Sequence, residues 1–269
     1  MTKTLLILGA TGRMGRHAAR AFGQAGWSVR RFDRARDRLP DAAKGADVIF
    51  NAWHVPYSRW EAELSGLTAQ VIEAAWATGA TVLIPGNVYV YGAGSPEVLG
   101  PETCHGATNP LGRLRRDMER AYREAGVRTI LLRAGNFLDT EASGNWFDMI
   151  IAKSAHRGTL RYPGKTDIPH AWAYLPDLAR AFVALAEKRG ELPTFTEVTF
   201  EGYAFSGEAL AEHCATALGR SVEVRRMSWV PLWAARLFWA EARHILEMRY
   251  LWNMPHRCLL YTSPSPRDS

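Results

Sequence analysis

The feature that most constrains this chain is a glycine turn set between an apolar run and a helical pattern. Residues 4–8 form a compact apolar run typical of a buried strand, and Gly-Ala-Thr-Gly-Arg-Met-Gly follows at 9–15. An apolar stripe at helical spacing continues to Ala25, and residues 28–32 form a second strand-like run that leads to Asp33. Strand, glycine turn, helix, strand and acid, in this order, predict a βαβ unit that binds a dinucleotide rather than a purely structural turn.

Each glycine of the turn has a separate physical role in such a unit. Gly9 permits the tight turn, Gly12 lets the backbone approach a pyrophosphate, and Gly15 lets the helix and the strand pack closely. The start of the helix adds unpaired N–H groups and the positive end of the helix dipole, and both attract phosphate. We therefore expect the pyrophosphate to lie at the start of this helix.

Strands and helices alternate with short connections through the first half of the chain. Apolar runs predict strands at 47–53, 81–84 and 127–132, and apolar stripes predict helices at 59–78 and 110–125. This alternation predicts the α/β class, with a Rossmann-type doubly wound parallel sheet.

Beyond Arg133 the pattern is less regular and predicts a smaller C-terminal α/β portion that binds substrate. The elements expected there are helices at 144–156, 176–187, 206–218 and 231–252 and strands at 160–162, 170–174, 195–200 and 222–225. We expect a dinucleotide-binding Rossmann domain over 1–135 and a mostly substrate-binding portion over 136–257. The helix at 176–187 is expected to pack back on the Rossmann sheet.

The final residues differ in composition from the rest. Residues 258–268 resemble a translated transposon adapter, in which Pro and Ser abruptly follow a stretch rich in Trp and Leu. We expect 258–269 to be a non-native tail and the natural chain to be truncated near Arg257. Two distant cysteines then remain, in a chain without a signal-peptide pattern, which favours a reducing cytoplasmic location and no disulfide framework.

Composition argues against several classes of protein. The formal net charge is +6, but acidic residues are interspersed with the basic ones, so we expect no nucleic-acid partner. No uninterrupted run of about 18 apolar residues occurs, so no membrane-spanning helix is expected. The eight histidines lack the spacing of metal ligands, so no metal site is expected. The charge suits a small anionic ligand, and the sequence leaves a homodimer open.

Three motifs together resemble the NAD-dependent epimerase/dehydratase family, the extended and atypical short-chain dehydrogenases/reductases. They are the glycine turn at 9–15, Asp-Val-Ile-Phe-Asn-Ala at 47–52 and Val-Tyr-Val-Tyr-Gly at 88–92. Looser similarity continues in the second half, for example at 135–137 and 177–180. The resemblance implies a Rossmann fold, NAD or NADP as the cofactor, and hydride transfer.

The resemblance also implies a set of cofactor contacts. Those expected at the pyrophosphate are Gly9, Thr11, Gly12, Arg13, Met14 and Gly15. Asp33 or Arg34 would meet the adenosine ribose, and Arg115 would bond ribose hydroxyls. Those expected along the nicotinamide half are Asn51, Ala52, Trp53, Ala134 and Gly135. For Trp53, a place in the core is equally open.

The residues leave the choice between NAD and NADP open. The Asp33 carboxylate can accept hydrogen bonds from a free 2′-hydroxyl, but it repels a 2′-phosphate. Nearby arginines can hold that phosphate by bidentate hydrogen bonds, namely Arg30, Arg31, Arg34 and Arg36. Arg31 and Asp33 share one face of the strand, so one can neutralise the other.

The chain departs from the family at its usual catalytic positions. Members that transfer hydride usually carry a Ser or Thr after the fifth strand of the family pattern, then a Tyr and a Lys four residues apart on the next helix. Here these positions correspond to Asn87, Leu111 and Arg115. Asn87 can donate to a carbonyl oxygen and Arg115 supplies positive charge, but leucine cannot transfer a proton.

Another side chain would then have to move the proton, and four are candidates: Tyr89, Tyr91, His54 and His105. A tyrosine needs neighbouring cations to lower its pKa from about 10, and Arg115 is such a cation. Histidine needs no such help. The expected catalytic set is Asn87, Arg115 and Tyr89.

Two functions follow as hypotheses. The first is an NAD(P)-dependent oxidoreductase or epimerase-like enzyme that acts on a small carbonyl or sugar-type substrate with a non-standard proton donor. The second is a catalytically inactive NAD(P)-binding sensor of the same fold, which the loss of the tyrosine at Leu111 favours.

Overall fold

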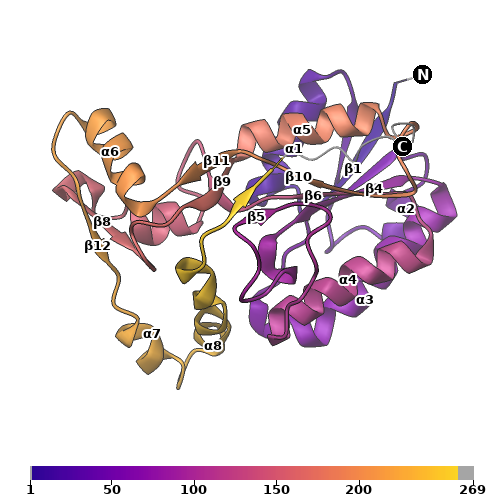
Figure 1. Ribbon diagram of the computed structural model, residues 1–269. Helices are drawn as coiled ribbons and strands as arrows, with labels where there is room; N and C mark the ends of the chain where they lie inside the picture. The colour runs from indigo at the N-terminus through magenta and orange to yellow at the C-terminus, as the bar shows by residue number, and fades with distance from the viewer. Residues whose placement is uncertain (1, 260–269) are drawn as a thin grey trace, which may run out of the picture.

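The computed structural model describes residues 2–259 and contains a six-stranded parallel sheet at its centre (Figure 1). In order across the sheet, the strands are β10 (Phe195–Thr199), β6 (Thr129–Arg133), β4 (Thr81–Gly86), β3 (Val48–Asn51), β1 (Thr4–Leu8) and β2 (Ser28–Phe32). The strand order reverses beside β1, because β2 lies on one side of it and β3 on the other. The predicted doubly wound α/β class is confirmed, and ligands of such sheets bind at this reversal.

Helices cover both faces of the sheet (Figure 1). One face carries α1 (Arg13–Gln24) and α5 (Leu175–Glu187); the other carries α2 (Leu39–Ala42), α3 (Trp60–Thr78) and α4 (Pro110–Ala125). Alternate side chains of β1 supply both cores, with Leu5 and Ile7 on the α1 side and Leu6 and Leu8 on the other. Burial on both faces explains why the inner strands are almost continuously apolar, whereas the edge strands β2 and β10 carry polar residues.

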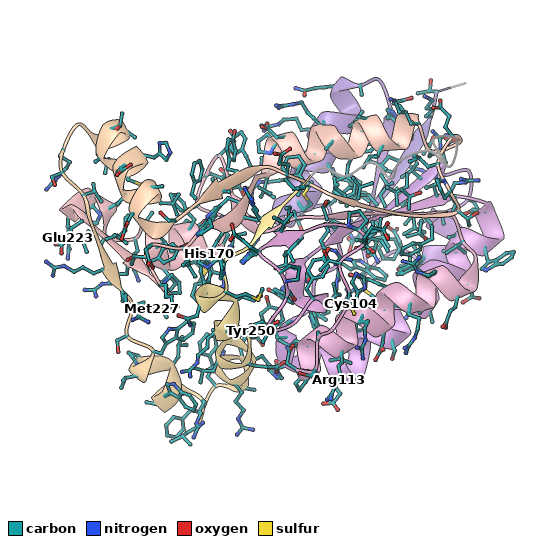
Figure 2. All side chains as sticks on the ribbon, viewed as in Figure 1. Cys104, Arg113, His170, Glu223, Met227 and Tyr250 are labelled. Carbon is teal, nitrogen blue, oxygen red and sulfur yellow. The ribbon has the colours of Figure 1, made fainter. Side chains whose placement is uncertain are left out.

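The second half of the chain contributes to the central sheet and also builds an outer lobe. β10 forms an edge strand beside β6, and α5 packs against α1. The lobe consists of β7 (Asn136–Leu138), β9 (His170–Tyr174) and β11 (Tyr203–Phe205) in one sheet, β8 (Thr159–Tyr162) paired with β12 (Glu223–Arg226), and α6 (Gly207–Leu218). Figure 2 shows His170 at the base of this lobe and Glu223 at its outer end.

The helix expected at 144–156 is replaced by a π-helical turn at Phe147–Ile151 and a 3-10 turn at Ala155–Arg157. The Asn145 side chain accepts hydrogen bonds from the backbone N–H groups of Phe147 and Asp148. These bonds cap the start of the segment, but the chain continues as a π-helical turn and a 3-10 turn, so the apolar stripe alone predicted too long a helix.

The long helix expected at 231–252 is broken into three pieces. They are α7 (Val230–Ala235), α8 (Ala240–Glu247) and a 3-10 segment, η5 (Met248–Asn253). Trp239, between α7 and α8, has extended backbone angles, so the helix cannot continue through it. The prediction of one continuous helix was wrong because α8 is oriented by hydrogen bonds to the first half of the chain, at Tyr57 and Leu111.

The C-terminal residues that the structure describes lie beside the first half of the chain. β13 (Arg257–Cys258) pairs with β5 (Val98–Leu99), and Cys258 is buried. The rest of the expected tail, 260–269, lies outside the described residues. Within residues 2–259, no helix combines the length and the apolar character needed to cross a membrane.

Candidate cofactor-binding and active site

The glycine turn lies between the end of β1 and the start of α1. A Cβ at Gly9 would lie 2.5 Å from the carbonyl oxygen of Ala52, and one at Gly15 would lie 2.1 Å from the carbonyl oxygen of Gly9. These two positions therefore require glycine because the chain packs against itself. At Gly12, by contrast, an added Cβ would meet a single protein atom, at 3.3 Å, and φ is −71°. Neither strain nor internal packing demands glycine there, which fits a surface kept open for a ligand.

The first turn of α1 is an anion site by its own chemistry. Its N-cap, Gly12, has no side chain to accept the N–H groups, and no acidic residue occurs in the first turn. The N–H groups and the positive end of the dipole of this twelve-residue helix point past Gly12. Arg13 adds a guanidinium, which donates to the carbonyl oxygen of Gly144 at 2.8 Å. A pyrophosphate suits this arrangement.

A cavity of about 370 Å³ opens beyond the end of β2. Its lining residues are Phe32, Arg34, Asp37, Arg38, Leu39, Pro40, Trp53, Leu67, Gln70 and Glu73. Trp53 packs against the ring of Phe32, and the Arg34 guanidinium lies 4.9 Å from the centre of the Trp53 ring. An apolar wall edged by arginines can hold a flat, phosphate-bearing ring system.

Asp33 is partly engaged within its own loop. Its carboxylate accepts a hydrogen bond from the N–H of Ala35 at 3.0 Å and lies 3.6 Å from Nε of Arg36. Arg34, in contrast, is exposed and faces the cavity. In this loop the Arg34 guanidinium faces the cavity, whereas the Asp33 carboxylate is engaged in bonds within the loop.

The residues expected along the nicotinamide half come from the carboxyl ends of two strands, β3 and β6, which lie on either side of β4. Asn51 ends β3, donates to the hydroxyl of Tyr122 at 3.0 Å and accepts from the N–H of Trp53. Ala134 follows β6 and is buried, and a Cβ at Gly135 would lie 2.2 Å from the carbonyl oxygen of Ala171. The side chain of Trp53 faces the cavity beyond β2 instead.

The three positions where the family usually carries Ser/Thr, Tyr and Lys lie close to one another. Asn87 follows β4, and its side-chain oxygen accepts from the N–H of Tyr89 at 3.1 Å. Arg115 on α4 is largely buried and donates to the carbonyl oxygen of Pro85. Its Nε is a buried donor without a hydrogen bond among the described residues. Leu111 is 1% exposed and packs in the core among Val88, Met248 and Leu251.

Two tyrosine hydroxyls meet beside these positions. Tyr89 lies on the 3-10 turn η2 (Val88–Val90), Tyr57 lies on η1 (Tyr57–Arg59), and their hydroxyl oxygens are 2.6 Å apart. Burial raises the pKa of Tyr89, although the hydrogen bond with Tyr57 and the charges of Arg115 and Arg13 oppose the rise. Burial and the proximity of Tyr89 raise the pKa of Tyr57 further. Both phenols therefore hold their protons at neutral pH.

Acidic side chains from α8 bind the backbone around this site. Glu241 accepts from the N–H groups of Tyr57 and Ser58, at 2.8 and 3.1 Å. Glu247 accepts from the N–H of Leu111 at 2.8 Å and from the side chain of Asn109. These bonds cap the starts of two chain segments and fix the orientation of α8.

A second cavity, of about 480 Å³, opens where α8 meets the segment around Tyr57. It is lined by His54, Pro56, Ser58, Trp239, Ala240 and Glu241. The His54 ring lies edge-on to the Tyr57 ring, with 6.1 Å between their centres. Desolvation and the charges of Arg13 and Arg115 lower the pKa of His54, which favours the neutral imidazole.

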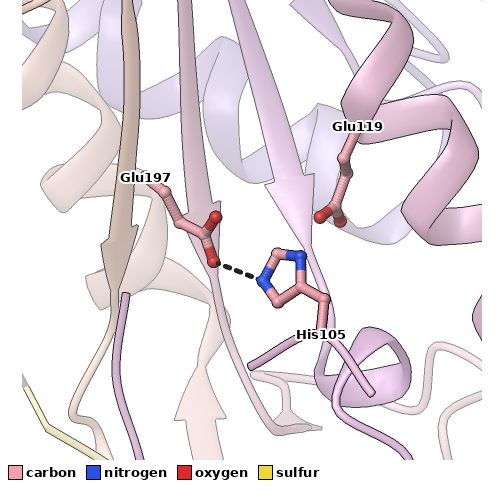
Figure 3. A group of neighbouring side chains, drawn as sticks. All are labelled: His105, Glu119 and Glu197. Atoms are coloured by element: carbon pink, nitrogen blue, oxygen red, sulfur yellow. Dashed lines mark hydrogen bonds and ion pairs between the residues drawn. The ribbon is translucent and has the colours of Figure 1, made fainter. Parts of the chain in front are cut away.

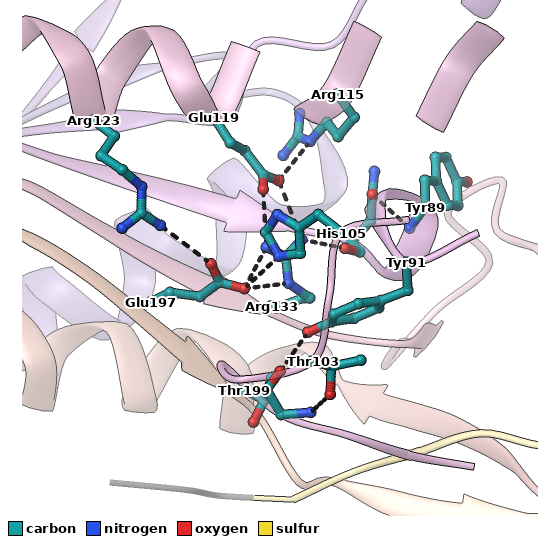
Figure 4. A network of polar contacts seen from close by, with 12 residues as sticks. Tyr89, Tyr91, Thr103, His105, Arg115, Glu119, Arg123, Arg133, Glu197 and Thr199 are labelled. Carbon is teal, nitrogen blue, oxygen red and sulfur yellow. Dashed lines mark hydrogen bonds and ion pairs between the residues drawn. The ribbon is translucent and has the colours of Figure 1, made fainter. Parts of the chain in front are cut away.

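A buried network of ion pairs contacts the segment of Asn87 and the side chain of Arg115 (Figure 4). Arg133, at the end of β6, is fully buried and bonds Glu119 on α4 at 2.9 Å and Glu197 on β10 at 2.6 Å. It also donates to the carbonyl oxygen of Asn87. Burial disfavours the guanidinium charge, but the two carboxylates outweigh it and raise the pKa of Arg133. The network fixes the backbone at Asn87.

His105 joins this network at Glu197, with 3.3 Å between Nε2 and Oε1 (Figure 3). The ligand atoms of His105, Glu119 and Glu197 lie within 4.8 Å of one another. The Arg133 guanidinium is hydrogen-bonded to both carboxylates and compensates their charge, so a metal ion would have to displace it. This arrangement is an ion network rather than a metal site. Tyr91, the remaining proton-donor candidate, is buried and donates to the carbonyl oxygen of Gly100.

Sequence reasoning missed Tyr57, Glu241 and Glu247 as parts of this site. Tyr57 bonds a residue 32 positions away, and the two glutamates bond residues 136 to 184 positions away. No local pattern signals such contacts. The pairing of Glu119 with Arg115 at i,i+4 on one helix was within reach of the sequence.

The sequence model of the NAD dependent epimerase/dehydratase family matches residues 5–197. This match covers the sheet, the glycine turn and the positions of Asn87, Leu111 and Arg115. No curated protein matches the sequence significantly.

Solved structures share the fold at low identity. UDP-glucose 4-epimerase from Brucella ovis, in complex with NAD, has a TM-score of 0.69 and 18% identity, covering 84% of this chain and 86% of that one. dTDP-4-dehydrorhamnose reductase from Bacillus anthracis str. Ames, in complex with NADP, has a TM-score of 0.69 and 16% identity, covering 85% of each chain.

Proposed function

The chain belongs to the NAD-dependent epimerase/dehydratase family, and on that premise we propose that it binds NAD(P) on the glycine turn and transfers hydride to or from a small carbonyl or sugar-type molecule. The observation that carries the proposal is the open backbone surface at Gly12, in front of an uncapped helix start. The family's name and the NAD- and NADP-bound neighbours support the choice of cofactor.

The residues divide along the length of the dinucleotide. We assign the pyrophosphate to the start of α1 and the adenosine to the cavity edged by Arg34 and Trp53. Asn51, Ala134 and Gly135 lie at the carboxyl ends of β3 and β6, on either side of β4, where the nicotinamide half of the cofactor would continue. When bound, the nicotinamide supplies or accepts the hydride.

The chain's own contribution is to bind, orient and polarise. The Arg115 guanidinium is held by the carbonyl oxygen of Pro85 and by Glu119, whose carboxylate lies 3.6 Å from Nε, and we assign it to a ribose hydroxyl or a substrate oxygen. The Asn87 side chain is held by its bond to the N–H of Tyr89. We place the substrate near the cavity at His54 and Glu241, which borders the segment carrying Tyr57.

The test is turnover with both reduced cofactors and a panel of aldehydes, ketones and nucleotide-linked ketosugars. We expect substrate-dependent loss of the near-ultraviolet absorbance of the reduced nicotinamide. Arg115→Met should lower the rate by at least tenfold, whereas Arg113→Met, an exposed residue on the same helix, should leave it unchanged. Cofactor binding without turnover of any compound would contradict the hydride-transfer proposal.

The packing of Leu111 supports a second candidate, a catalytically inactive NAD(P)-binding sensor. The Leu111 side chain is buried against η5, so the core leaves little room for a tyrosine ring at this position. A sensor would bind the cofactor as tightly as an enzyme and respond to it by a change in structure. Cofactor-dependent protection of α8 from hydrogen exchange, together with absence of turnover, would favour this candidate.

A further inference from the structure

The missing tyrosine leaves a chemical gap that the hydroxyl pair of Tyr57 and Tyr89 can fill. Leu111 carries no proton and is enclosed in the core, and its N–H is bonded to Glu247. Tyr91 is committed to the carbonyl oxygen of Gly100, and His105 is committed to Glu197. Of the four proton-donor candidates, Tyr91 and His105 therefore have structural roles.

We propose that Tyr89 is the proton donor of the reaction. Tyr57 is the positioning residue that holds the Tyr89 hydroxyl and returns a proton to it. This inference rests on the proposed hydride transfer and adds the identity of the group that completes it. The carrying observation is the 2.6 Å contact between two phenolic oxygens at the carboxyl edge of the sheet.

The location of the pair follows from the topology. Tyr57 follows β3 and Tyr89 follows β4, and these strands are neighbours in the sheet. Tyr89 lies two residues after Asn87, and the positive charges of Arg115 and Arg13 oppose the rise in the pKa of its hydroxyl. Tyr89 thus belongs to the same short segment after β4 as Asn87, one of the usual catalytic positions.

Tyr57 is held on several sides. Its N–H is bonded to Glu241, and its ring lies edge-to-face with Trp60, with 5.2 Å between the centres. Its hydroxyl has Tyr89 as its hydrogen-bond partner, so its rotamer serves that contact. Such double support is what a positioning role requires.

The proposed step balances in atoms and electrons. As the carbonyl carbon receives a hydride from the reduced dinucleotide, the π electron pair of the C=O bond moves to oxygen. The oxygen takes the proton of the Tyr89 hydroxyl, Tyr89 takes the proton of Tyr57, and water reprotonates Tyr57. In the oxidative direction the same protons move in reverse.

The first measurement needs neither cofactor nor substrate. In protein labelled with fluorotyrosine, the resonances of the two residues are assigned by their disappearance in Tyr57→Phe and Tyr89→Phe. Because the hydrogen bond with Tyr57 opposes the rise in the pKa of Tyr89, Tyr57→Phe should raise the pH at which Tyr89 titrates. Tyr203→Phe, on the exposed outer lobe, should move neither resonance. Independent titration of the two phenols would overturn the coupling.

The second measurement is activity in the same proteins. Tyr89→Phe should lower the reduction rate by about a hundredfold or more, and Tyr57→Phe by about tenfold. Tyr57→Phe should also move the basic limb of the kcat/KM profile upward, in step with the Tyr89 titration. Cofactor affinity should stay unchanged in all variants.

The outcomes separate the two proposals. Turnover by the parent protein with full activity in Tyr89→Phe overturns the assignment of the proton donor and leaves the proposed function standing. Absence of turnover by the parent protein overturns the proposed function and the proton donor with it. Loss of activity in Tyr89→Phe, with the shifted profile in Tyr57→Phe, supports both.

Discussion

Leu111 is the residue at which this chain departs most from its family. Its side chain fills a packed region that includes Val88, Met248 and Leu251, and its backbone is bonded to Glu247. The substitution of a leucine for the family's tyrosine is therefore built into the core, and its reversal has a structural cost.

Restoring the tyrosine should destabilise the protein. Leu111→Tyr inserts a larger ring and a hydroxyl into a full core, so we expect the free energy of unfolding to fall by about 1–3 kcal/mol. Urea denaturation measures the change. Leu237→Tyr, at an exposed position, is the matched control and should alter stability little. An unchanged or higher stability for Leu111→Tyr would mean that a cavity for the ring exists.

Arg34 is predicted to select the cofactor. Its guanidinium faces the cavity beyond β2, while the Asp33 carboxylate is bonded within its own loop. We expect tighter binding of NADP⁺ than of NAD⁺, and Arg34→Ala should weaken NADP⁺ about tenfold while changing NAD⁺ little. Calorimetric titration measures both affinities. Arg225→Ala, an exposed arginine on the outer lobe paired with Glu223, is the control. Equal losses for the two cofactors would contradict the assignment.

At the residue scale, the sequence predicted what is local. Gly9, Gly12 and Gly15 are recognisable because their spacing and their flanking elements define one turn. The contact between Tyr57 and Tyr89 depends on two loops that only the folded sheet brings together. The side-chain direction of Trp53 was likewise undetermined, because a strand end can turn either way.

Among the elements, α8 links distant parts of the chain. Its two glutamates accept N–H groups at the starts of η1 and α4, as capping side chains do within a single helix. The element is short and mostly half-buried, and its two glutamates add fixed bonds to the contacts of its own apolar face.

Removing one of these caps should loosen both α8 and the start of α4. We expect Glu247→Ala to lower the free energy of unfolding by about 1–3 kcal/mol, because it leaves the N–H of Leu111 without its acceptor. Hydrogen exchange should speed up at the first turn of α4. Glu212→Ala, on the exposed face of α6, should have little effect. Unchanged exchange at α4 would show that the cap contributes nothing.

Elements with strong local signals were predicted within a few residues of their bounds. Pro110 and Gly126 mark the ends of α4, and Ser206 caps α6 through the N–H of Ala209. The two expected helices that the structure breaks carry apolar stripes whose continuity is overridden. In one, the chain turns through a π-helical and a 3-10 segment, and in the other, α8 follows contacts with η1 and the start of α4.

At the scale of the molecule, stability should depend on pH through the base of the outer lobe. His170 is fully buried, and its Nδ1 lies 2.5 Å from the Tyr162 hydroxyl. Burial, together with the nearby His256, lowers the pKa of His170 to about 3. Between that value and its ordinary value of 6.5, the unfolded chain binds a proton that the folded chain does not.

Stability should therefore be complete above pH 6.5 and fall by about 1.4 kcal/mol for each pH unit below it. Denaturation at pH 7.5 and pH 5 measures the difference, which His170→Gln should reduce. His156→Gln, on the surface of the lobe, should leave it unchanged. A pH dependence that is the same in His170→Gln and the parent protein would contradict this assignment.

The overall topology was predictable because strands and helices alternate with short connections, which leaves few parallel arrangements. The place of β10 at the edge of the central sheet was not, since pairing between distant strands has no local signature.

The account rests on a dinucleotide bound in front of Gly12, and one calorimetric titration with NADP⁺ and NAD⁺ tests it most directly. Gly12→Ala places a methyl group where the pyrophosphate would lie but clashes little with the protein itself. Gly23→Ala, on the same helix with open space around it, is the control. We predict binding to the parent protein and to Gly23→Ala, and at least tenfold weaker binding to Gly12→Ala at a nearly unchanged melting temperature. Equal affinity in all three proteins, or no binding to any of them, would contradict the account.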